Sequence, residues 1–157
     1  MTDTVSLHLT ALAAIERTIT GVTTAYDAAP DDLSDHSVLP AFINFPLRST
    51  VQWFPRDSES VRGIETRLWA ARLYVLPEGA SASGDPITLC APFFDRVRDA
   101  FQGQPRLNNT PFVKLATFDG DEGIIWDDLI YAADRFSGIV FRLTIETYVT
   151  VNYASGQ

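Results

Sequence analysis

The feature that most constrains the fold of this chain is a stretch near its C-terminus in which apolar and polar residues alternate without a break. The alternation runs from Ile139 to Tyr153. One side of an extended chain would carry Ile139, Phe141, Leu143, Ile145, Thr147, Val149, Val151 and Tyr153. A period of two with β-branched and aromatic residues is typical of a half-buried strand. We therefore predict a long C-terminal strand with one face on the core.

The length of this strand exceeds what one compact domain needs. The 15 positions from 139 to 153 would extend over about 50 Å at roughly 3.3 Å per residue. A compact domain of 157 residues has a diameter of about 40 Å. A straight strand would thus extend past its own domain. We expect its last third, Val149–Tyr153, to contact another subunit.

Composition limits the classes of protein to consider. The length predicts a single domain over residues 1–157, with residues 1–6 and 154–157 flexible. The net charge of −8 and the single lysine, Lys114, argue against general nucleic-acid binding, which needs clustered cations. The lone cysteine, Cys90, excludes an internal disulfide and fits a reducing compartment. No apolar run approaches the ~20 residues of a membrane span, so we expect no membrane association.

Hydrophobic spacing predicts two helices among several strands. The first helix is expected over residues 6–26, and the second is expected to begin near residue 91, because an interior proline at Pro92 would clash with the preceding turn. Asp85-Pro86 could be a cap and first helical residue. The expected strands span residues 38–46 (an edge), 49–54, 64–76 (central), 112–118 and 124–126, with residues 127–136 ambiguous. The order predicts an α+β fold, with two helices packed on a mostly antiparallel β-sheet and a long C-terminal strand.

No catalytic or cofactor-binding motif is present. The acidic turn Asp119–Gly123 lacks the glycine and glutamate spacing of a calcium loop and is better explained as a hairpin turn. His8 and His36 are interpreted as packed or solvated side chains. We expect no catalytic, cofactor-binding or metal residues and no enzyme activity.

Aromatic residues are frequent on segments that we expect at the edge of the sheet. Exposed aromatics at an edge are typical of protein–protein contacts, although a place in the core is the commoner interpretation for each residue taken alone. Together with the end of the last strand they form a candidate subunit interface. Its predicted residues are Phe42, Phe45, Trp53, Phe54, Val149, Val151 and Tyr153.

A family resemblance adds to this pattern over about residues 8–150. The positions that carry it are Tyr26-Asp27-Ala28-Ala29-Pro30, Leu39-Pro40-Ala41-Phe42, Arg67–Leu76 with the Gly/Ser loop after it, Pro92-Phe93-Phe94-Asp95-Arg96-Val97, Tyr131, and the strand with Gly138, Phe141 and Leu143. In these positions and in element order the chain resembles the tail terminator and tail-completion proteins of long-tailed bacteriophages and related head–tail joining, or neck, proteins.

The resemblance implies a structural protein of the virion, present in the host cytoplasm during assembly. Such proteins form a ring, commonly a homohexamer, that caps the tail tube and joins it to the head connector. The implied partners are further copies of the chain, the tail tube protein and the head–tail connector, while DNA passes through the lumen without specific binding. An acidic lumen would let a polyanion slide, and ring subunits can extend a neighbour's sheet by β-augmentation.

Three alternatives stay open at this stage. The chain could be a neighbouring head–tail connector or neck subunit, which shares the helix-and-sheet plan. It could be a soluble ligand-binding α+β domain, which would be a monomer without an overhanging strand. It could also be a small enzyme using Asp119, Asp121 or Asp127 with a divalent metal.

Overall fold

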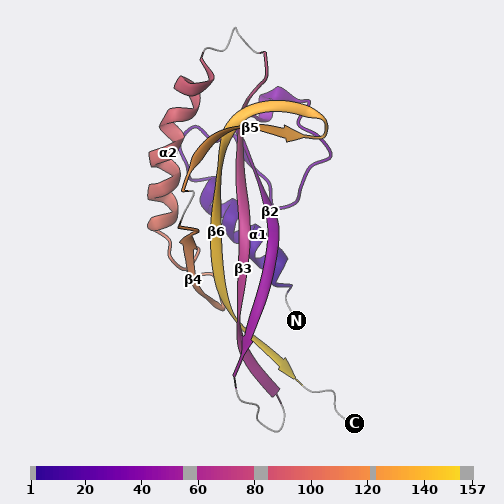
Figure 1. Ribbon diagram of the computed structural model, residues 1–157, viewed down its shortest axis with the longest axis vertical. Coiled ribbons are helices and arrows are strands. Elements are labelled where there is room, and N and C mark those ends of the chain that lie inside the picture. The colour runs from indigo at the N-terminus through magenta and orange to yellow at the C-terminus, as the bar shows by residue number, and fades with distance from the viewer. Residues whose placement is uncertain (1–2, 55–59, 80–84, 121–122, 153–157) are drawn as a thin grey trace.

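The protein is a two-layer α+β structure in which two helices cover one face of a single sheet (Figure 1). The computed structural model describes residues 3–54, 60–79, 85–120 and 123–152. Within these residues the sheet is six-stranded, in the order β1-β2-β3-β6-β4, with β5 also paired to β6. The predicted α+β class is confirmed. The elements are α1 (Thr4–Glu16), β1 (Thr24–Ala25), β2 (Ala41–Trp53), β3 (Ser60–Pro77), α2 (Pro86–Gln102), β4 (Val113–Phe118), β5 (Ile125–Tyr131) and β6 (Asp134–Asn152).

The burial of residues along β6 alternates, as predicted from the sequence. Its residues at odd positions from Ile139 to Thr147 are buried, while those between them are half-buried or exposed. The strand is 19 residues long and begins at Asp134, five positions before the predicted start. β3 pairs with it along almost its whole length, and β3 is the central strand that was predicted.

The first residues of β6 form a hairpin with β5, in the region that the sequence leaves ambiguous. Ala132 and Ala133 both have positive φ, 49° and 71°, as a two-residue hairpin turn of the right twist requires. Alanine is an unusual residue for such a turn, which is why the signal is weak in the sequence. The hairpin curls over the sheet at the end opposite the C-terminus (Figure 1).

Helix α1 is shorter than predicted and lies closer to the N-terminus. Asp3 caps it, so residues 4–6 are helical rather than flexible. It ends at Glu16, where the Thr18 and Ile19 N–H groups donate to carbonyls three residues back. Gly21, with a φ of +94°, prevents a helix from continuing to residue 26. Ile19 is buried all the same, which explains why the apolar spacing appears to continue.

Helix α2 begins at Pro86, five residues before the predicted start. The Asp85 carboxylate accepts a hydrogen bond from the Ile87 N–H, so the predicted cap is confirmed. Pro92 lies inside the helix and removes the hydrogen bond that the Thr88 carbonyl would otherwise accept. Thr88 is exposed, so water can solvate that carbonyl.

Two apolar clusters lie on opposite faces of the sheet. The larger cluster lies beneath the two helices and includes Trp69 and Phe141. The smaller one lies beneath the β5–β6 hairpin and the loop that contains Leu33. β2, predicted as two short strands, is one strand with a bulge between Pro46 and Arg48, and its edge position is confirmed, since β1 pairs with only two of its residues.

Candidate functional site

The far end of the sheet extends beyond both helices as a three-stranded projection (Figure 1). We define this distal arm as residues 51–54, 60–65 and 147–152, which belong to or directly follow β2, β3 and β6. β3 lies in the middle, and its residues pair with β2 on one side and β6 on the other. Residues 147–152 of β6 therefore pair with β3 of the same chain. The expectation that Val149–Tyr153 contacts another subunit stays a prediction.

One face of the distal arm carries an uncovered apolar strip. Trp53, Gly63 and Val149 stand side by side in one cross-strand row. Val61 and Val151 form the next row, and residues opposite one another on neighbouring strands share a face. This is the face that the helices cover further along the sheet, since it also contains the buried Thr147.

Gly63 has no side chain and so leaves room for the indole of Trp53. A Cβ at Gly63 would lie 2.8 Å from Cε3 of Trp53, so the indole packs directly against the glycine backbone. Even so, Trp53 is 47% exposed and Val151 is 42% exposed. Apolar surface of this kind at the end of a sheet is typical of a contact with another protein.

Apart from Thr147, both outer edges of the distal arm lack a strand partner within the described residues. β2 pairs only with β3 from Ile43 to Trp53. β6 has its last pairing with β4 at Thr147, and the Tyr148 N–H donates to the Phe112 carbonyl just beyond it. Free edges of this kind can accept a strand from another chain.

The predicted interface residues divide between the core and the arm. Phe42 is fully buried beneath the helices, with its ring edge-on to Phe141 at 6.1 Å, so its assignment to a subunit interface is wrong. It pairs with both β1 and β3 at the one place where β2 is not an edge. Phe45 is half-buried on the opposite face, where the Arg72 guanidinium lies 5.0 Å from its ring centroid.

The remaining interface residues lie on the distal arm or outside the described residues. Trp53, Phe54 and Val151 are exposed, and Val149 is half-buried. Tyr153 lies outside the described residues. The structure thus brings four of the seven predicted residues together in one projection, and their contact with another subunit stays a prediction.

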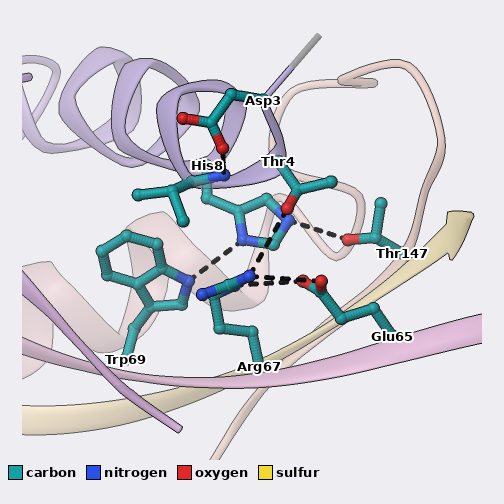
Figure 2. Close-up of polar contacts among 8 residues, drawn as sticks. Asp3, Thr4, His8, Glu65, Arg67, Trp69 and Thr147 are labelled. Atoms are coloured by element: carbon teal, nitrogen blue, oxygen red, sulfur yellow. Dashed lines mark hydrogen bonds and ion pairs between the residues drawn. The ribbon is translucent and has the colours of Figure 1, made fainter. Parts of the chain in front are cut away.

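A buried polar network fixes α1 to the root of the distal arm (Figure 2). The Trp69 indole N–H donates to Nδ1 of His8 at 3.0 Å, and Nε2 of His8 lies 2.7 Å from the Thr147 hydroxyl. Because an indole can only donate, Nδ1 must be the acceptor, and the ring is neutral with its proton on Nε2. Burial lowers the pKa of His8 to about 4. The ring is edge-on to Trp69, 5.9 Å between centroids.

An ion pair next to the histidine holds the first turn of α1. Nε of Arg67 lies 3.0 Å from the Glu65 carboxylate, and its Nη2 donates to the second carboxylate oxygen at 3.2 Å. The same Nη2 lies 3.4 Å from the Thr4 hydroxyl. Figure 2 shows the pair directly beneath the imidazole. The distal arm is therefore joined to the helical layer through specific polar contacts as well as packing.

A shallow hollow of about 360 Å³ opens beside this root. Its lining includes Leu7 of α1, Phe112 and Val149. Phe112 is 68% exposed and has a φ of +68°, a conformation that bulky residues rarely adopt. An exposed, strained aromatic next to a free strand edge extends the apolar surface of the arm.

The sequence-level candidates for metal chemistry find no support in the described residues. Asp121 and Glu122 of the acidic turn lie outside them. Among residues 3–54, 60–79, 85–120 and 123–152, no three His, Cys, Asp or Glu side chains are grouped to hold a metal ion. In the same part of the chain, no helix is both long and apolar enough to cross a membrane.

Comparison with known proteins does not assign a family. No family model matches the sequence, and a search of curated proteins gives no significant match. Function is therefore inferred from the residues and their arrangement.

Proposed function

We propose that this protein is a structural subunit that assembles with further copies of itself into a ring and serves as a phage tail terminator. In this role the ring caps the tail tube and joins it to the head connector. The observation that carries the proposal is the distal arm, which combines an uncovered apolar strip with two free strand edges.

The position of the free edges favours a ring over a two-fold dimer. β2 and β6 lie on opposite margins of the arm, with β3 between them. If the β2 edge of one subunit pairs with the β6 edge of the next, each subunit keeps one edge free for a further copy. Contacts of this head-to-tail kind close into rings when the rotation between subunits allows it. Edge pairing leaves both faces of the sheet open, so covering the strip that contains Trp53 requires a further contact from the neighbouring subunit.

The charge of the chain is consistent with a conduit for DNA. Each subunit has a net charge of −8, and a ring of several copies would present a strongly negative field. Such a field disfavours adhesion of a polyanion that passes through the ring. The same charge would weaken association between subunits at low salt, so assembly must depend on apolar contacts and strand pairing.

The oligomeric state of matched variants tests the assembly half of this proposal. Light scattering after size exclusion, with and without the tail tube protein, should give a ring mass for the wild type. Trp53→Asp combined with Val151→Asp should leave a folded monomer. Ile130→Asp is the control, because Ile130 is an apolar residue that is more exposed than either, at 58%, and lies on β5 away from the arm. A ring that survives the arm substitutions would contradict the role of the arm.

Electron microscopy of particles made without the protein tests the biological half. We expect tails of uncontrolled length or tails that do not join heads. Normal, length-controlled tails attached to heads would refute the tail terminator role. Cross-linking to the tube protein rather than only to the connector would separate a terminator from a neighbouring neck subunit.

A further inference from the structure

The last residue of α1 is a carboxylic acid in the interior of the protein. Glu16 has no exposed surface, and it lies against Asn44 of β2, which is also buried. Nδ2 of Asn44 donates to Oε1 of Glu16 at 2.6 Å. This is the polar contact between α1 and the edge strand, two turns along the helix from His8.

Two oxygen atoms of this pair have no hydrogen-bond partner among the described residues. They are Oε2 of Glu16 and Oδ1 of Asn44. Both are acceptors when the carboxylate is ionised, so neither can satisfy the other. A proton on Oε2 turns that oxygen into a donor. A carboxylic acid and a primary amide can then form two complementary hydrogen bonds, and one proton satisfies both atoms.

The surroundings also oppose a negative charge at this position. Glu16 is at the C-terminal end of α1, where the helix dipole is negative. Burial raises the pKa of Glu16 to about 8, against smaller lowering effects of the Asn44 hydrogen bond and of Arg17. The Arg17 guanidinium is directed elsewhere, since it donates to the Ala25 carbonyl at 2.8 Å. Among the described residues, Arg17 is the only charged group that lowers this pKa, and its effect is smaller than that of burial.

We infer that Glu16 is a proton-binding site, in which the carboxyl is held protonated against Asn44 and the contact between α1 and β2 weakens when the proton is lost in mild alkali. The inference is independent of the proposed function, because it concerns one subunit. Loss of this proton would weaken the packing of α1 against β2 at the C-terminal end of the helix, which is the end away from the root of the distal arm.

Titration of wild-type protein tests the site without any substitution. NMR of the side-chain carboxyl carbon of Glu16 should show the protonated form at neutral pH and a transition near pH 8. An ionised Glu16 at neutral pH would overturn the inference. The measurement needs only the folded chain.

Urea unfolding as a function of pH provides the second test, with Glu16→Gln as the variant. Gln keeps the size of the side chain and supplies an N–H to Asn44 at every pH. Between about pH 6.5 and 8 the wild-type unfolding constant should rise by up to tenfold per pH unit relative to that of the variant. The control is Glu78→Gln, which alters an exposed carboxylate. Equal pH dependence in wild type and Glu16→Gln would refute the coupling of this proton to stability.

Discussion

Substitution of His8 by Gln should remove one source of acid sensitivity from the fold. The imidazole is neutral and buried, and it accepts from Trp69 while its other nitrogen faces Thr147. Protonation of Nδ1 would place an N–H against the indole N–H and break that hydrogen bond. Gln offers one acceptor and one donor but does not titrate, so it can approximate the neutral ring.

The expected size follows from the difference between the folded and unfolded pKa values of His8. Burial, the largest cause, lowers the value from 6.5 to about 4, while Glu65 and Asp3 raise it and Arg67 lowers it. Because the folded value is depressed, the unfolded chain binds the proton more readily. The stability contributed by the neutral ring is complete above about pH 6.5 and is lost as the pH falls towards 4, a loss of about 3 kcal/mol.

The assay is the free energy of unfolding by urea at several pH values, for wild type and variant. His8→Gln should be less stable than wild type near neutral pH by about 1–2 kcal/mol, because Gln packs less well beneath Trp69. The difference should shrink, then reverse, as the pH falls from about 6.5 to 4. His36→Gln is the control, since His36 is exposed. A constant difference between wild type and His8→Gln over this range would refute the argument.

Two backbone predictions follow from the fold. Gly138→Ala should destabilise the protein by about 3 kcal/mol or more in urea unfolding, because the added Cβ would lie 1.9 Å from the Leu73 carbonyl oxygen. Gly120→Ala, where nothing lies within 4 Å, is the control, and equal stability of the two variants would contradict the packing at residue 138. Asp85→Ala should lower the melting temperature by removing the cap on the Ile87 N–H, a cost of about 1 kcal/mol. An unchanged melting temperature would show that water replaces this cap.

The central strands could be predicted because their pattern has a single physical cause. In β6, side chains alternate between a buried and a more exposed face, so Phe141 and Leu143 identify the core side directly. The pattern places the C-terminal end of the strand to within one residue but misses its first five residues, which form the hairpin with β5. It does not show that β3 would extend just as far and pair with the end of β6.

Local signals failed where the chain offers two conflicting ones. The apolar spacing of α1 continues through Ile19, but α1 ends at Glu16 and the positive φ of Gly21 prevents a helix from continuing further. Pro92 argues for a late start of α2, but the cap at Asp85 decides the start. Phe42 lies on an edge strand, but it is one of the two residues of that strand that pair with β1. In the two helices one local signal outweighs another, and only for Phe42 does a contact from elsewhere in the chain decide the outcome.

The buried polar residues were beyond sequence reasoning for a different reason. His8 and Thr147 are 139 positions apart, and Glu16 and Asn44 are 28 apart. One indirect signal exists, since Trp69 and Thr147 lie on predicted buried faces and their polar atoms require partners. The sequence does not say which residues provide them.

The two titratable groups on α1 act in opposite directions on stability. Stability associated with neutral His8 is lost as the pH falls from about 6.5 to 4, while stability associated with protonated Glu16 is lost as the pH rises from about 4.5 to 8. Between about pH 4.5 and 6.5 the two slopes have similar size and opposite sign, so they offset each other in the wild type. A flat wild-type profile in this range is therefore no sign that either group is inert. Glu16→Gln should expose the histidine slope there, and His8→Gln should expose the glutamate slope, because each variant removes one of two opposing terms. A helix held by two neutral, buried titratable groups would thus be most stable against unfolding in the mildly acidic range and would lose stability on either side of it.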